Sequence, residues 1–151
     1  MTFNLRTFAL AALVAIASLS QTMHAQTSPV DARVNVPFSF DYGTAHFGSG
    51  TYIISMNGPD TLVVRNRVSS QSAMALAQLS SEPNLTQSGV VTFRKYGDRY
   101  FLVEVSIAGS GDHISVWESK AEKRAARELA SRGAEPTQLA VAILPTFYSG
   151  N

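Results

Sequence analysis

The sequence contains no cysteine and only three histidines among its 151 residues. Without cysteine the fold cannot depend on disulfides, and thiol catalysis and thiolate metal sites are excluded. His24 lies in the N-terminal segment discussed below, which leaves His46 and His113 for any later site. A zinc site usually needs three or four protein ligands, and only Asp112 stands beside either of these histidines. We therefore predict no metal site and no cofactor.

An excess of charge of one sign is missing as well. The chain has 12 Lys and Arg against 11 Asp and Glu, a formal net charge of +1. This balance does not favour electrostatic attraction to nucleic acid or to an anionic membrane surface, so we expect no nucleic-acid partner. With 45% hydrophobic and 15% charged residues, the composition is that of a folded chain, and the length allows one domain.

Long hydrophobic runs are also absent. The apolar run at residues 8–19 follows Arg6 and spans roughly a dozen residues, against the roughly 20 that cross a bilayer as a helix. A basic start, a short apolar run and a small residue at a suitable cut are the parts of a secretory signal. We predict a signal peptide over residues 1–25, cleaved between Ala25 and Gln26; cleavage after Ser20 and an uncleaved anchor are the alternatives. The mature chain is then periplasmic or secreted in a bacterium, without a stable membrane anchor.

Behind the signal we expect a flexible N-terminal segment at residues 26–32, a single β-rich domain at 33–146 and a frayed C-terminus at 147–151. Residues 34–40 alternate strictly between apolar side chains and Asn35, Pro37 and Ser39, which is the pattern of a half-buried strand. Pro37 has no backbone N–H to donate, so it indicates the edge of a sheet or a bulge. We predict an edge strand.

Turn residues divide the middle of the chain into short segments. The tetrapeptide Asn-Gly-Pro-Asp at 57–60 joins two β-rich runs, and Gly97 with Asp98 joins two more as a tight hairpin. Residues 73–79 fit a strand or a short helix equally well by periodicity. Residues 80–89 form a predicted polar loop, and 113–117 a further short strand.

One helix is predicted near the C-terminus. Ser119 and Glu122 have the spacing of a capping box, and Gly133 is placed as a C-terminal stop. Ala121, Ala125 and Leu129 form a narrow apolar stripe, which predicts shallow packing against a sheet. The uncharged run at 139–144 follows as a last strand, predicted to be buried on both faces.

About eight short strands, one C-terminal helix and a last strand indicate a mainly β fold, either an antiparallel sandwich or a small barrel. The pattern of strands and turns leaves the choice between the two open.

Few residues offer chemistry. Asp112, His113 and Ser115 suggest a hydrolase, but neighbouring residues of a strand point to opposite faces, so Asp112 cannot orient His113 as a catalytic triad requires. Three tyrosines flank predicted turns and are therefore candidates for an exposed ligand surface: Tyr42, Tyr96 and Tyr100.

The chain resembles a group of small secreted bacterial proteins in which a strand of the V-x-V-P-F-x-F type precedes a G-T-Y element. Here the strand is residues 34–40, the element is residues 50–52, and Val-Trp-Glu-Ser at 116–119 opens a charged helix. The proline that usually precedes the element is absent, since Phe-Gly-Ser stands at 47–49. That group has no assigned activity, so the resemblance implies export and a β-rich fold and no catalytic residue.

The functional expectation is an exported, non-enzymatic β-domain that binds a small ligand or contributes to the cell envelope. A barrel that holds a small molecule inside and a hydrolase that uses His113 are the alternatives. The sequence does not indicate the ligand or partner.

Overall fold

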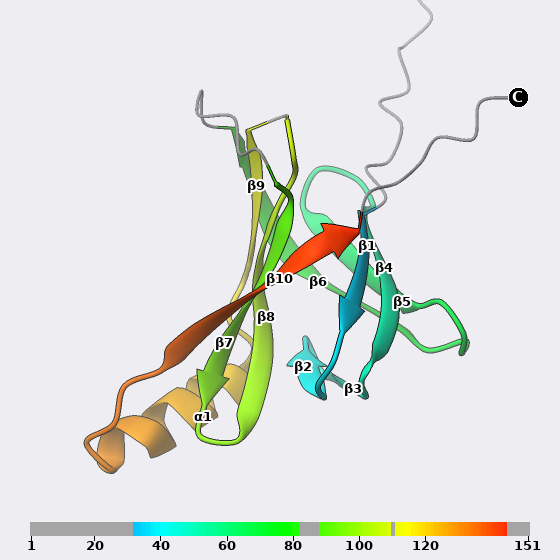
Figure 1. Cartoon of the computed structure of the whole chain (residues 1–151). Coiled ribbons are helices and arrows are strands. Elements are labelled where there is room, and N and C mark those ends of the chain that lie inside the picture. The colour runs from blue at the N-terminus through cyan, green and yellow to red at the C-terminus, as the bar shows by residue number, and fades with distance from the viewer. Residues whose placement is uncertain (1–31, 82–87, 110, 145–151) are drawn as a thin grey trace, which may run out of the picture.

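The computed structural model describes residues 32–81, 88–109 and 111–144, and all structural statements below concern these residues. They form ten strands and one helix (Figure 1). In chain order the elements are β1 (Ala32–Val36), β2 (Phe40–Tyr42), β3 (Ala45–Phe47), β4 (Gly50–Met56), β5 (Thr61–Asn66), β6 (Ser72–Ser81), β7 (Val90–Tyr96), β8 (Arg99–Ser106), β9 (Asp112–Val116), α1 (Lys120–Ser131) and β10 (Thr137–Leu144).

Eight of the strands close into an antiparallel barrel. Their order is β8-β7-β10-β1-β4-β5-β6-β9, and β9 pairs back onto β8 through the register partners Val105 and Ile114. The remaining hairpin, β2–β3, attaches to β8 by a parallel pair between Asp41 and Phe101. The mainly β fold is confirmed, and of the two predicted architectures the barrel is the one adopted.

The prediction of one edge strand over residues 34–40 is wrong. β1 ends at Val36, and after Pro37 the chain turns into β2, which begins at Phe40. Because Pro37 lies between the strands, it costs no ladder hydrogen bond. β1 pairs with β4 on one side and with β10 on the other, so closure of the barrel leaves it no free edge.

Both predicted hairpins are confirmed. The turn at 57–60 joins β4 to β5, and Gly97, at φ +61°, joins β7 to β8 with Asp98. The ambiguous residues 73–79 belong to β6, a ten-residue strand that also includes Ser80 and Ser81 of the predicted loop. β6 pairs with β5 over its first half and with β9 over its second half, which lets it bridge two parts of the barrel wall.

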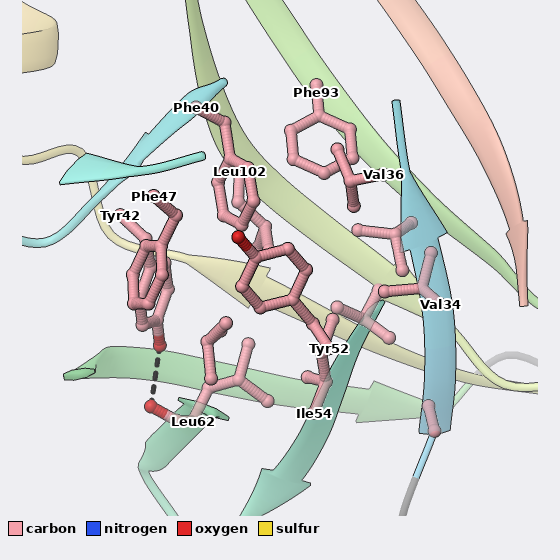
Figure 2. Close-up of a cluster of buried hydrophobic side chains, with 14 of the residues drawn as sticks. Val34, Val36, Phe40, Tyr42, Phe47, Tyr52, Ile54, Leu62, Phe93 and Leu102 are labelled. Carbon is pink, nitrogen blue, oxygen red and sulfur yellow. Dashed lines mark hydrogen bonds between the residues drawn. The ribbon is translucent and has the colours of Figure 1, made fainter. Parts of the chain in front are cut away.

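Aromatic side chains pack the barrel interior (Figure 2). Phe40 contacts three other rings, those of Phe47, Tyr52 and Phe93, at centroid distances of 5.1 to 5.2 Å. The Tyr52 hydroxyl donates a hydrogen bond to the Gly48 carbonyl, so this ring is anchored as well as packed. Over the first half of β6, Ala73 and Ala75 pack against this core, while Met74 and Leu76 are exposed.

A β-bulge places α1 against the outside of β8. The register between β7 and β8 skips Val103, so the alternation of inward and outward side chains changes phase at that residue. As a result Leu102 and Val105 lie in the interior, while Phe101 and Val103 face the helix. The predicted helix stripe, Ala121 with Ala125 and Leu129, packs on this outer face.

The caps of α1 are as predicted. The Ser119 hydroxyl accepts a hydrogen bond from the Glu122 N–H at 3.1 Å, and Gly133, at φ +70°, donates to the Ala130 carbonyl at 2.9 Å. A left-handed glycine after the last turn is a common helix end.

The last strand is where predicted, but its predicted burial on both faces is wrong. All but two of the residues of β10 are exposed, including Leu139 and Leu144. The helix that precedes β10 covers β8 instead, so β8 is the strand covered on both faces. β10 has six register pairs with β7 and only two with β1, Arg33 with Leu144 and Val34 with Ile143.

The barrel begins one residue before the predicted domain of residues 33–146. Ala32, assigned to the flexible segment 26–32, is buried and belongs to β1. The predicted signal peptide and the C-terminal residues 145–151 lie outside the described residues. Within the described ranges, no helix is both long and apolar enough to span a membrane.

Candidate functional site

Two of the three candidate ligand tyrosines are not exposed. Tyr42 is 1% exposed, and its hydroxyl donates a 2.6 Å hydrogen bond to the Leu62 carbonyl inside the barrel (Figure 2). Burial raises the pKa of Tyr42 far above its ordinary value. Tyr96 is buried between the barrel and α1. Only Tyr100 is partly exposed, and it stacks on Phe38 at 4.3 Å. The expectation failed because a strand end can point inward as readily as outward.

A polar cluster lies under α1. The Glu122 carboxylate accepts hydrogen bonds from the Tyr96 hydroxyl at 3.2 Å and from Arg94 at 3.3 Å. Arg94 also reaches Glu118 at 3.4 Å. Burial raises the pKa of Glu122 above its ordinary value, and the positive charge of Arg94 only partly opposes this effect. Each member has a partner within the cluster, so the cluster joins the helix to β7 and leaves no group free for a ligand.

His113 has polar neighbours, but they do not form a catalytic triad. Its Nδ1 lies 3.0 Å from the Ser106 hydroxyl and 3.1 Å from a Glu104 carboxylate oxygen. In a triad the serine and the acid contact opposite ring nitrogens, whereas here both contact the same one. Asp112 points elsewhere and hydrogen-bonds with Ser81 across the β6–β9 pair.

The other histidine belongs to a surface ion-pair network. His46 Nδ1 lies 2.9 Å from one oxygen of Asp41, and Arg99 donates to the other oxygen at 2.8 and 3.1 Å. Arg99 also lies over the ring of Phe101 at 4.9 Å. The network fixes the β2–β3 hairpin to the start of β8.

A groove on the outside of the barrel is a further candidate site. It has a volume of about 750 Å³ and lies between β6, the β2–β3 turn and the start of α1; we call it the β6–α1 groove. It is lined by Gly43, Thr44, Met74, Ala75, Leu76, Arg99, Trp117, Glu118, Ser119, Lys120, Ala121 and Arg124. This volume is in the range of small-molecule sites.

Large apolar side chains are exposed in this groove. Met74 is 65% exposed, Leu76 is 53% exposed, and Trp117, the single tryptophan of the chain, is 62% exposed. The backbone N–H of Trp117 donates a hydrogen bond to the Leu76 carbonyl at 3.0 Å, which fixes the two residues opposite each other. Clustered exposed apolar groups of this kind mark binding surfaces more often than scattered ones do.

Two positively charged residues lie beside these apolar residues in the groove. Lys120 and Arg124 are exposed on α1, and within the described part of the chain neither forms an ion pair. The two other ionised residues of the lining already form ion pairs, Arg99 with Asp41 and Glu118 with Arg94. The uncompensated charge at the groove is therefore positive.

The sequence analysis missed this groove. Residues 73–77 read Ala-Met-Ala-Leu-Ala, an alternation between small and large apolar residues. Alternation between apolar and polar residues indicates which face of a strand is buried. In this segment both the small and the large residues are apolar, so the sequence does not indicate which face is exposed to water.

Within residues 32–81, 88–109 and 111–144, no group of three or more potential ligands is placed to hold a metal ion. Comparisons with protein-family models, curated proteins and solved structures find no match to this chain. The resemblance to small secreted bacterial proteins therefore stays a prediction from short motifs, and the functional argument depends on the groove.

Proposed function

We propose that this protein is an exported, non-enzymatic binding protein of the bacterial cell envelope that holds its ligand in the β6–α1 groove. The observation that supports this most is the cluster of Met74, Leu76 and Trp117, each more than half exposed, beside two cations that form no ion pair with the described residues. Leaving such side chains in water costs roughly 25 cal/mol for each Å² of apolar surface, a cost that a ligand would remove.

The outer groove suits a ligand better than the interior of the barrel does. Phe40, Phe47, Tyr52 and Phe93 pack ring against ring there, and all four are at most 1% exposed. A ligand placed among these rings would have to displace them, which close-packed cores resist. We therefore favour the groove over the alternative of a small molecule held inside the barrel.

Binding at the groove can be measured through Trp117. The probe is N-phenyl-1-naphthylamine, an uncharged apolar fluorophore that accepts energy from tryptophan. We expect saturable binding with energy transfer from Trp117, because this residue lines the groove and is the single tryptophan. The double variant Met74→Ser with Leu76→Ser should bind the probe at least about tenfold more weakly, since it removes most of the apolar contact surface.

The matched control is Val68→Ser, because Val68 is 93% exposed and does not line the groove. It should leave probe binding unchanged, and circular dichroism should show that all variants keep the fold. If the probe does not bind, or if the control weakens binding as much as the double variant does, the groove is not the site.

Export is tested separately by expressing the whole chain in a Gram-negative host and determining the N-terminus of the product. We expect a soluble periplasmic protein that begins at Gln26. An uncleaved product in the inner membrane would contradict the proposed export and would point to an anchor at residues 8–19.

A further inference from the structure

The backbone of β6 faces the groove at Met74. Ala77 donates to the Asp60 carbonyl on the β5 side, while the Leu76 carbonyl accepts from Trp117 on the opposite side. In an antiparallel strand the N–H and C=O groups of successive residues point to alternate sides. Met74 therefore directs its backbone groups away from β5, and β9 does not reach it, since the β6–β9 pairing begins at Ala77.

A peptide strand cannot easily add at this position, because the β2–β3 turn occupies it. A Cβ atom on Gly43 would lie 3.4 Å from the Met74 carbonyl oxygen and 3.6 Å from the Ala75 Cβ. Gly43 has φ +60°, a left-handed conformation that glycine adopts without strain, and this turn lies within van der Waals distance of β6. The groove is therefore suited to a ligand that side chains hold, rather than to one that extends the sheet.

The side chains of the groove divide into an apolar part and a cationic part. The apolar part is contributed by β6 and Trp117, and Met74 gives it a flexible, adaptable surface. The cationic part is Lys120 and Arg124, which lie one turn apart on the same side of α1. Both parts belong to one continuous groove, so a single molecule can contact both.

We propose that the β6–α1 groove binds a single-chain anionic amphiphile, with its apolar chain on Met74, Leu76 and Trp117 and its anionic head group at Lys120 and Arg124. This rests on the proposed function, which requires only that the groove binds an apolar ligand. Arg99 already pairs with Asp41, and Glu118 pairs with Arg94, which Glu122 shares, so Lys120 and Arg124 supply the net positive charge of the lining.

The test compares three amphiphiles with the same twelve-carbon chain, each kept below its critical micelle concentration: dodecanoate, dodecanol and dodecylammonium. Binding is followed by Trp117 fluorescence in the mature protein. We expect dodecanoate to bind at least about tenfold more tightly than dodecanol, and dodecylammonium to bind most weakly. The preference for dodecanoate should fall as salt is added, because both cations are exposed.

A charge-removal pair and its control locate the head group. Lys120→Ser with Arg124→Ser should abolish the preference for dodecanoate and leave dodecanol binding unchanged. Lys123→Ser with Arg127→Ser removes the same charge from the same helix outside the groove lining and should keep the preference.

The outcomes separate the two proposals. If the uncharged fluorophore binds but dodecanoate has no advantage over dodecanol, the amphiphile assignment is wrong and the groove remains a binding site. If an acidic apolar pentapeptide binds more tightly than dodecanoate, the occupant is a peptide and the assignment is again wrong. If neither the fluorophore nor any amphiphile binds, both proposals fail.

Discussion

Tyr42 shows how a single polar atom contributes to the stability of this core. Its hydroxyl lies inside the barrel and donates to the Leu62 carbonyl at 2.6 Å. We expect Tyr42→Phe to lower the free energy of unfolding by about 1 to 2 kcal/mol, because a buried hydrogen bond is lost while the ring is kept. Urea unfolding measures this. Tyr100→Phe is the control, because Tyr100 is only partly buried and should cost clearly less; equal costs would contradict the expectation.

Glu122 should make stability depend on pH. Burial raises its pKa in the folded protein above the ordinary value of 4.5, so the folded state holds the proton more tightly than the unfolded state does. The free energy of unfolding should therefore fall as pH rises from 4.5 through the raised pKa, by about 1.4 kcal/mol for each unit by which the pKa is raised.

The measurement is urea unfolding of the wild type and Glu122→Gln at a series of pH values. The wild type should lose stability relative to the variant as pH rises across this window. Glu128→Gln, an exposed change on the same helix, should follow the wild type. A stability difference between wild type and Glu122→Gln that does not change with pH would show that the carboxyl does not titrate in this way.

The exposure of single residues was the part of the structure that the sequence predicted least well. Tyr42 and Tyr96 stand beside glycine turns, yet both are buried. A tyrosine has an apolar ring and a polar hydroxyl, so it is stable inside whenever the hydroxyl finds an acceptor. For Tyr42 that acceptor is Leu62, twenty residues away, and for Tyr96 it is Glu122, twenty-six residues away. Local sequence contains neither pairing.

The start of α1 is the clearest case of a sequence signal that determines an element. We expect Ser119→Ala to lower the free energy of unfolding by about 1 kcal/mol, since the Glu122 N–H would lose its acceptor. Thermal unfolding should show the loss. Ser131→Ala, at the other end of the helix, is the matched control, because its hydroxyl only donates to the Glu128 carbonyl and caps no N–H. A larger effect at Ser131 would contradict this interpretation.

Other elements were predictable in type but not in surroundings. The two hairpins and the helix follow from local turn and capping residues, which operate within a few positions. The end of β1 just before Pro37 depends on which strands lie alongside, and so does the change at Val103 in which side chains point inward. The exposure of β10 depends on where α1 packs, and an uncharged run alone cannot indicate that position.

At the level of the whole barrel, β10 forms the weakest part of the wall. Most of its side chains are exposed, and only two register pairs join it to β1. We expect the backbone amides of β10 to exchange with solvent at least about tenfold faster than those of β7 and β8, because little apolar burial opposes local opening. Hydrogen exchange followed by NMR measures this. Equal protection of β10 and β8 would mean that the barrel opens only as a whole.

The sequence predicted a mainly β, antiparallel molecule of about eight strands, against the ten that the described residues form, and it left sandwich and barrel unresolved. The two architectures share short alternating strands and differ in whether every edge strand pairs to close the wall. One of the pairings that complete this wall joins Arg33 and Val34 to Leu144 and Ile143, more than a hundred residues away in the chain. The groove depends on long-range geometry as well, because β6, the β2–β3 turn and α1, which line it, are far apart in the chain.

The pairing of β1 with β10 joins the first described strand to the last one, so the two partners are synthesised at different times. A polypeptide emerges from the ribosome, or from any export channel, with its N-terminus first. β1 is therefore available from the start, whereas the strand that seals it is the last to appear (Figure 1). Until then one side of β1 has no neighbour, so the wall can close only after the strand that pairs with it there has been synthesised.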